Sequence, residues 1–140
     1  MFRSIVVGTD GSQTADEAVR QAAELAGLLG ARVHLVCVYE PADVGDEPPG
    51  SGWERGSREV VDATLARSAA VFAHAGVEVD LFPQRGDPAD SILDVAEERN
   101  ADLIIVGNRG RSGAERFLLG SVPNRISHHA PCAVLIIRTP

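Results

Sequence analysis

The feature that most constrains the fold is a series of short apolar runs rich in β-branched residues, separated by longer segments of helical pattern. Three runs, residues 4–8, 102–107 and 133–138, are almost continuous in Val, Ile and Leu, as expected for strands covered on both faces. The runs at 32–38 and 77–82 complete the set, and the stronger alternation of 77–82 is compatible with an edge strand. The sequence therefore predicts five β-strands.

Helical patterns occupy the intervals between these runs. The first helix is expected from Ser12 to Gly30, and two caps fit its start: Ser12, or a capping box formed by Thr14 and Glu17. The glycine suits its C-terminal end. The other helices are expected from near Trp53 to Gly76, from the cap Asp87 and the first-turn Pro88 to near Asn100, and from around residues 121–124 to just before Pro131.

Strands that alternate with helices form parallel sheets, because each helix carries the chain back to the end of the sheet where the previous strand began, by a right-handed crossover. We therefore expect residues 1–140 to form one domain, a doubly wound, Rossmann-like α/β fold of the adenine nucleotide hydrolase-like type. Its five parallel strands take the order 3-2-1-4-5, with helices on both faces. The order reverses between the first and fourth strands, and ligands of such folds bind beyond the carboxyl ends of those strands.

Composition narrows the class of protein. The formal net charge is −7 and all 13 basic residues are Arg, so a nucleic-acid partner is not expected. No apolar stretch approaches the roughly 18 residues of a membrane span, and the amino-terminal residues do not resemble a signal peptide. The two cysteines, Cys37 and Cys132, are expected to be buried, reduced thiols. These features predict a soluble cytoplasmic protein.

Glycines follow the fourth apolar run at Gly107 and Gly110, and nine residues later Gly120 precedes Ser121. Glycine adopts positive φ readily and leaves its backbone N–H accessible. The first-turn amides of the helix near Ser121 have no intrahelical partners and lie at the positive end of its dipole. A single glycine in such a place commonly serves a tight turn, but this spacing at the strand reversal predicts an anion site. The absence of Lys excludes a Walker-type phosphate loop.

Two stretches, "GTDGS" from residue 8 and "GDPADSILDVAEERNADLIIVGNRGRSGAERFLLGSVPNRISHHAPCAVLIIR" from residue 86, resemble the universal stress protein family, and the resemblance covers the whole chain. The pattern G-x-x-G-x9-G-[S/T] is the signature of the family's ATP-binding branch. The resemblance implies ATP as the ligand, with Mg²⁺ held mainly by phosphates and water. The implied nucleotide-binding residues include Thr9, and Asp10 at the ribose or the phosphate-bound metal. The backbone of Val38 is implied at the adenine, and the rest follow the glycine pattern: Gly107, Asn108, Arg109 and Gly110 at the ribose and phosphates, and Gly120, Ser121 and Val122 at the phosphate tail.

The resemblance also implies a function: a nucleotide-sensing regulator of the stress response that acts as a homodimer. The last strand is expected to be an apolar edge, which invites pairing with a second chain through Val134, Leu135, Ile136 and Ile137. The Pro-, Gly- and acid-rich segment 39–57 leaves the second strand beside the expected crevice, where it is either a lid or a linker. Departures from the family pattern are mild: Asn108 replaces a smaller residue, and the last strand begins "PCAV" where a proline before the valine is usual.

Two alternative functions remain open. A slow ATP-hydrolysing enzyme would need a group that positions or activates water, and the candidates near the phosphates are Asp10, Ser121 and a bound Mg²⁺, with Arg109, Arg111 and Arg116 available to stabilise charge. No catalytic base is evident, because the four histidines lack metal-ligand spacing and no Ser-His-Asp order is recognisable. A nucleotide-free dimerisation module is disfavoured by the intact glycine signature.

Overall fold

Five parallel strands form one sheet in the order β3-β2-β1-β4-β5 in the computed structural model, which describes residues 1–39, 57–108 and 120–138. The expected sheet order is thus confirmed. The strands are β1 (Ser4–Gly8), β2 (Arg32–Tyr39), β3 (Val79–Arg85), β4 (Leu103–Gly107) and β5 (Ala133–Ile137), and the helices are α1 (Gln13–Leu29), α2 (Arg58–His74), α3 (Pro88–Glu98) and α4 (Ser121–His129).

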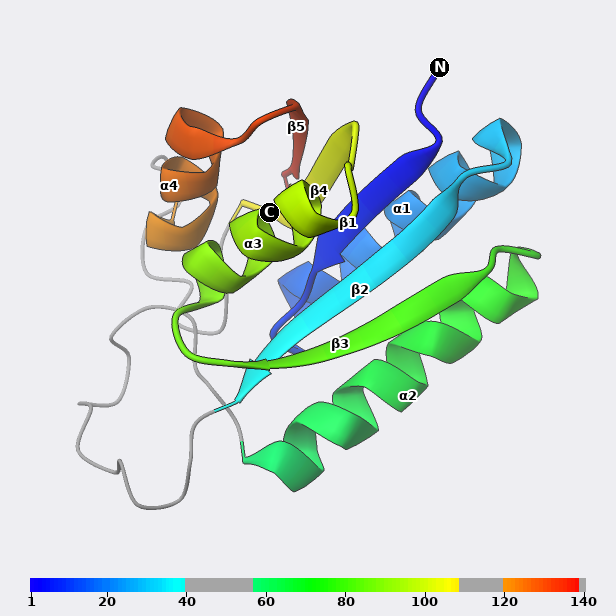
Figure 1. Ribbon diagram of the computed structural model, residues 1–140. Coiled ribbons are helices and arrows are strands. Elements are labelled where there is room, and N and C mark those ends of the chain that lie inside the picture. The colour runs from blue at the N-terminus through cyan, green and yellow to red at the C-terminus, as the bar shows by residue number, and fades with distance from the viewer. Residues whose placement is uncertain (40–56, 109–119, 139–140) are drawn as a thin grey trace.

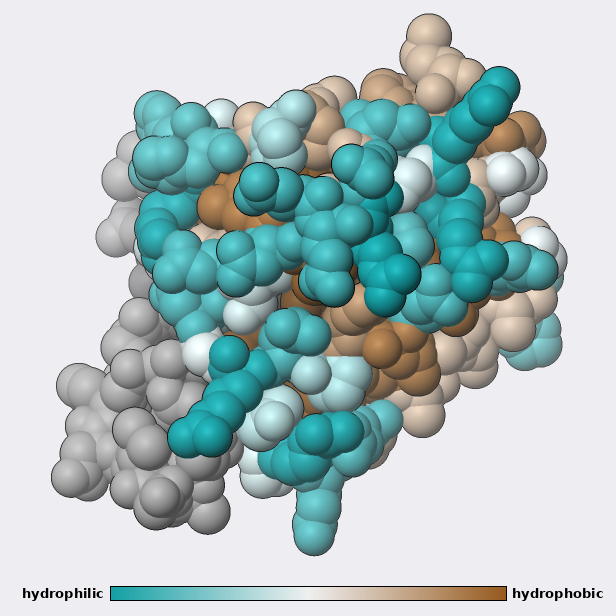
Figure 2. Space-filling model, viewed as in Figure 1, coloured by the Kyte–Doolittle hydropathy of each residue, from teal (hydrophilic) through white to brown (hydrophobic). Residues whose placement is uncertain are grey.

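Helices cover both faces of the sheet (Figure 1), with α1 and α2 on one side and α3 and α4 on the other. Alternation along the strands divides the core accordingly: Ile5 and Val7 pack toward α1 and α2, whereas Val6 packs toward α3 and α4. Figure 2 shows the α3 and α4 face, where hydrophilic side chains cover the helices and hydrophobic residues are visible between α3 and α2. Within the described ranges, no helix is long and apolar enough to cross a membrane.

Local signals set most helix ends. Ser12 caps α1, because its Oγ accepts a hydrogen bond from the Ala15 N–H at 3.2 Å. The alternative capping box is wrong: Thr14 already lies inside the helix, and Glu17 accepts hydrogen bonds from Arg20 and Gln21 instead. At the other end Gly30 takes a left-handed conformation with φ of 66°, as expected for a C-terminal glycine.

The remaining helices also begin at side-chain caps or turns. Ser57 caps α2, while the expected start near Trp53 lies outside the described residues. Asp87 caps α3 and Pro88 is its first residue, as the sequence predicts. The helix α4 begins at Ser121 and ends two residues before Pro131, so its predicted limits are confirmed.

The third strand differs from its expected position, since β3 begins at Val79 rather than at residue 77. The Val77 N–H donates to the Phe72 carbonyl at 3.0 Å, so Val77 completes the turn that ends α2 instead of joining the sheet. The strand then runs through Pro83, which a central strand would not tolerate because proline has no N–H to donate. The expectation that this strand is an edge is confirmed.

The two cysteines are free thiols in the structure, but only Cys37 is buried. Cys132 is partly exposed, which corrects the expectation of a buried thiol. Its position just before β5, a strand at the edge of the sheet, explains the incomplete cover. Burial nevertheless raises the pKa of the Cys132 thiol, and Asp102 raises it further.

Candidate functional site

The candidate site lies where the order of the strands reverses. The strands β1 and β4 are parallel neighbours, with Val7 in register with Ile105, and their carboxyl ends therefore meet at the same edge of the sheet. Thr9 and Asp10 follow β1, and Asn108 follows β4. All three are buried polar residues, with exposed fractions of 0%, 5% and 5%. Because ligands of such folds bind where the strand order reverses, these buried polar side chains make this edge of the sheet the candidate ligand site.

The β1–α1 turn is held by its own side chains. The Thr9 N–H donates to the Val36 carbonyl at 3.0 Å, which continues the β1–β2 pairing one residue further. Thr9 Oγ1 accepts a hydrogen bond from the Gly11 N–H at 3.2 Å, and Asp10 Oδ1 accepts one from the Ser12 N–H at 3.0 Å. Gly11 has a φ of 79°, where a side chain would be strained. Sequence reasoning missed this requirement, although the Asp-Gly pair is a turn signal.

Close packing at the end of β1 also requires glycine. A Cβ on Gly8 would lie 2.5 Å from Ile92 Cδ1 and 3.2 Å from Val106 Cγ1. Ile92 belongs to α3 and is fully buried. The missing side chain therefore allows α3 to approach the sheet directly beneath the turn that carries Thr9 and Asp10.

On the other side, the backbone of Asn108 joins three elements. Its N–H donates to the Ile137 carbonyl at 2.9 Å, and its carbonyl accepts from the Gly120 N–H at 3.0 Å. The end of β4 is therefore tied both to the edge strand β5 and to the start of α4. This contact brings together two parts of the glycine pattern that are separated along the chain. Arg109 and Gly110 lie outside the described residues, as do Arg111 and Arg116.

The amino end of α4 has no cap from its own side chains. Its N-cap is Gly120, which makes no side-chain hydrogen bond, and the first turn contains no acidic residue. By contrast α1, α2 and α3 are each capped by a Ser or Asp side chain and have an acidic residue in the first turn. Pro123 lies within the first turn of α4, where its missing N–H costs nothing. This helix end can therefore accept an anion from outside the chain.

The remaining described residues of the glycine pattern have ordinary backbone conformations. Gly107 is the last residue of β4, paired with Ile137, and it is not among the described glycines with positive φ. Gly120 has a φ of −62°, which any residue can adopt. Val38 is buried near the carboxyl end of β2, and Ser121 and Val122 begin α4, as the sequence places them.

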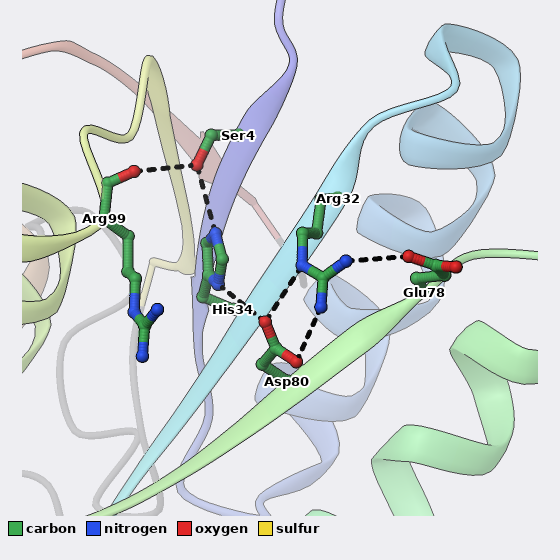
Figure 3. Close-up of polar contacts among 6 residues, drawn as sticks. All are labelled: Ser4, Arg32, His34, Glu78, Asp80 and Arg99. Carbon is green, nitrogen blue, oxygen red and sulfur yellow. Dashed lines mark hydrogen bonds and ion pairs between the residues drawn. The ribbon is translucent and has the colours of Figure 1, made fainter.

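A second polar cluster lies toward the other end of the sheet and was not foreseen (Figure 3). The strands bring Ser4, His34 and Asp80 into a row: Ser4 Oγ lies 3.1 Å from His34 Nε2, and His34 Nδ1 lies 3.5 Å from Asp80 Oδ2. The row has the order of a Ser-His-Asp triad, which the sequence did not reveal. It lacks the contacts of one, however, because 3.5 Å is too long for a hydrogen bond, and Nδ1 has no hydrogen-bond partner among the described residues.

The charges around this row are satisfied within the protein. Arg32 Nε and Nη2 donate to the two oxygens of Asp80 at 3.0 and 2.9 Å, and these bonds hold the pKa of Asp80 below its usual value. Burial lowers the pKa of the His34 imidazole, which Asp80 opposes. Ser4 Oγ also donates to the Arg99 carbonyl at 3.4 Å. The cluster is therefore a structural network that joins β1, β2, β3 and the end of α3.

Together, these features define a Rossmann-like α/β protein with a candidate ligand site at the carboxyl ends of β1 and β4. The universal stress protein family model matches residues 1–138, and the chain belongs to that family. The chain is 33% identical to universal stress protein MJ0531 of Methanocaldococcus jannaschii, over 100% of this chain and 84% of that protein. It is 35% identical to universal stress protein Rv1636 of Mycobacterium tuberculosis, over 99% and 97% of the two chains.

Solved structures of the family include nucleotide complexes. A universal stress protein in complex with cAMP matches with a TM-score of 0.77 and 30% identity, covering 99% of this chain and 98% of the other. The universal stress protein of Archaeoglobus fulgidus in complex with dAMP matches with a TM-score of 0.69 and 28% identity, over 97% and 98%. Among the described residues, no group of three or more His, Cys, Asp or Glu side chains could hold a metal ion.

Proposed function

We propose that this protein is a cytoplasmic stress-response regulator, folded as one domain, that binds ATP with Mg²⁺ at the carboxyl ends of β1 and β4. The observation that carries the proposal is the uncapped amino end of α4, tied by the Gly120 N–H to the carbonyl of Asn108. The phosphates take the place of the missing cap. The related proteins whose structures contain cAMP and dAMP support an adenine nucleotide as the ligand.

Different groups around the proposed crevice bind different parts of the nucleotide. The amides at the start of α4 supply donors and the positive end of a dipole to the phosphates, without requiring a lysine. The buried Asp10 lies at the ribose or the metal, and the backbone of Val38 lies at the adenine, with Thr9, Gly107, Asn108, Arg109, Gly110, Ser121 and Val122 completing the site. Mg²⁺ takes most of its ligands from phosphates and water, since the described residues offer no metal cluster.

Isothermal titration with Mg-ATP tests the site directly. The variant Gly120→Val with Ser121→Asp adds a side chain and a negative charge where the phosphates are proposed to lie. We expect its affinity to fall by at least about a hundredfold, since two charged hydrogen bonds of about 1.5–3 kcal/mol each are lost. Ser127→Asp adds the same charge to an exposed position in the second half of α4, so this control should bind as tightly as the wild type. Equal binding by wild type and double variant would refute the site.

The identity of the nucleotide is tested in the same assay. ATP, cAMP and dAMP share adenine but differ in the number and geometry of their phosphates. Because the helix end acts on phosphate charge, we expect Mg-ATP to bind more tightly than either monophosphate. Mass spectrometry of the natively purified protein should find ATP bound. If only cAMP is recovered, and if cAMP binds more tightly than Mg-ATP in the titration, then cAMP is the ligand instead of ATP.

We further propose that β5 pairs with its counterpart in a second copy to form a homodimer. This strand is an edge of the sheet, and Leu135 in its centre is 38% exposed. An apolar edge without an internal proline or charge offers its N–H and carbonyl groups to another chain. Light scattering at micromolar concentration should give a dimer, and Leu135→Arg should give a monomer. A monomeric wild type would contradict this proposal.

A further inference from the structure

We propose that the groove between α1 and α2 is a second binding site, for a small molecule with one carboxylate on an apolar body, and that Arg67 couples it to the β1–α1 turn. The coupling rests on the proposed nucleotide site, whereas the groove itself does not. The groove lies on the face of the sheet opposite α3 and α4, with a volume of about 340 Å³. That volume falls within the range of small-molecule sites.

The lining of the groove combines an apolar floor with charged walls. Val71 of α2, which is partly exposed, supplies apolar surface, and the buried Val19 of α1 lies beside it in the lining. The charges come in two pairs, Asp16 with Arg67 and Glu17 with Arg20, so they sum to zero. Asp16 and Glu17 would repel a polyanion strongly. Their repulsion of a ligand with one carboxylate is weaker, and one arginine can offset it. The lining is completed by Gln13 and Ser68.

Ser68 carries an unsatisfied polar atom in this lining. The residue is 2% exposed, and its Oγ has no hydrogen-bond partner among the described residues. A buried hydroxyl without a partner is costly, and helical serines commonly relieve that cost by bonding to the carbonyl four residues earlier. Ser68 makes no such bond. Its O–H is therefore a donor for an oxygen that the described residues do not supply.

Arg67 offers the matching positive charge. Its Nη2 donates to Asp16 Oδ1 at 3.1 Å and to the Gly11 carbonyl at 3.3 Å. The bonds to Asp16 and Gly11 are made by Nη2, and the side chain is 54% exposed. A guanidinium presents pairs of N–H groups that match the two oxygens of a carboxylate. One carboxylate can therefore take hydrogen bonds from both Arg67 and Ser68, while its apolar body covers the valines.

The same arginine touches the turn that precedes α1. Gly11 follows Asp10 directly and has the positive φ on which the turn depends. A carboxylate that draws the guanidinium into the groove weakens the bond to the Gly11 carbonyl. Binding in the groove is thereby expected to lower the affinity of the nucleotide site, and by reciprocity the nucleotide lowers the affinity of the groove.

A titration with sodium hexanoate, followed by amide chemical shifts in NMR, tests the groove, with hexanamide as the neutral probe of the same length. We expect saturable shifts on α1 and α2 with hexanoate and at least tenfold weaker binding of hexanamide. Arg67→Met and Ser68→Ala should each weaken hexanoate binding at least tenfold. Arg58→Met is the matched control, since Arg58 lies on α2 and pairs with Asp62 outside the groove. Its affinity should equal that of the wild type.

Three results would overturn the groove site: no saturable shifts, equal affinity for the two probes, or equal affinity of Ser68→Ala and wild type. A thermal melt of unliganded Ser68→Ala guards against a folding defect, because removing an unpaired buried hydroxyl should hold or raise the melting temperature. The coupling is tested by titrating Mg-ATP with and without saturating hexanoate, where about a fivefold or greater loss of affinity is expected. An unchanged ATP affinity overturns the coupling alone, whereas failure of ATP to bind without hexanoate overturns the proposed function and leaves the groove standing.

Discussion

The amino ends of α3 and α4 lie on the same face of the sheet and are built in opposite ways. The first turn of α3 carries its own anions: Asp87 caps the helix, and Asp87 and Asp90 both bind Arg125 from α4 at 2.8 and 2.7 Å. The first turn of α4 has neither a side-chain cap nor an acidic residue. The contrast separates a helix end that is capped by a side chain of the chain itself from one that, in the proposed function, is completed by the phosphates of a ligand.

Giving α4 a cap of its own should abolish that contrast and produce the largest effect. Gly120 has an ordinary φ of −62°, so Gly120→Asp fits the backbone and places a carboxylate at the end of α4. We expect the affinity for Mg-ATP to fall about thirtyfold or more, while the free energy of unfolding without ligand rises by a few tenths of a kcal/mol. Titration calorimetry and urea denaturation measure the two. A loss of both affinity and stability would mean that the glycine serves the fold.

The packing that positions α3 should show the next largest effect. In Gly8→Ala the new methyl group meets Ile92 Cδ1 at 2.5 Å, so α3 must shift or Ile92 must change its conformation. Overpacking of this kind costs about 1–3 kcal/mol of unfolding free energy. Combining it with Ile92→Val, which shortens the clashing side chain, should recover part of the loss. If the single variant unfolds at the same urea concentration as the wild type, the close approach is not required.

Removing the side-chain cap of α3 should have a smaller effect on stability and should leave ligand binding unchanged. Asp87→Ala removes the cap on the Asp90 N–H at 2.9 Å and one of the two partners of Arg125. Loss of a cap costs about 1 kcal/mol, and the exposed ion pair adds little. Urea denaturation should show this loss, Asp87→Asn should show less of it, and the affinity for Mg-ATP should not change. A large loss of affinity would contradict the division between the two helix ends.

The smallest effect is expected far from both helix ends, at His34. Its folded-state pKa lies below the usual value of 6.5 because the imidazole is buried. As pH falls through about 6.5, the unfolded chain takes up a proton more readily than the folded protein, so stability falls. His34→Gln lacks this titration, and its stability should fall less between pH 7.5 and 5.5. Asp80 stays ionised over this window, since its pKa lies below 3.8.

Identical pH profiles for wild type and His34→Gln would show that the His34 imidazole titrates alike in the folded and unfolded states. Denaturation curves at each pH give the comparison directly, because the exposed histidines are shared by both proteins. The result also bears on the difference between the two helix ends, since His34 belongs to a polar cluster whose charged groups pair within the protein.

Sequence patterns predicted the architecture well because the decisive signals are local. The apolar runs predicted all five strands, their alternation with helices predicted a doubly wound sheet of the observed order, and the pair Asp87–Pro88 marked the start of α3. The start of β3 was misplaced by two residues because it depends on the bond from Val77 to Phe72, which no periodicity reveals. The choice between Ser12 and Thr14 as the cap of α1 was likewise decided by geometry.

The candidate site was predictable to the level of its strand ends and no further. Thr9, Asp10 and Asn108 lie after adjacent strands because the order of the sheet requires it. The hydrogen bond from Arg67 to the Gly11 carbonyl joins residues that are 56 positions apart, and the row of Ser4, His34 and Asp80 spans three strands. Contacts of this kind depend on how two elements pack against each other, and a single sequence carries no signal for them.

The backbone of Asn108 connects the proposed crevice to the proposed contact edge through one residue. Its N–H, bonded to the last residue of β5, and its carbonyl, bonded to the N-cap residue of α4, belong to two successive amide planes that meet at its Cα. Any influence of an occupied crevice on a neighbouring copy paired at β5 therefore passes through the φ and ψ of a single residue, and that residue is where the two proposed interactions become coupled.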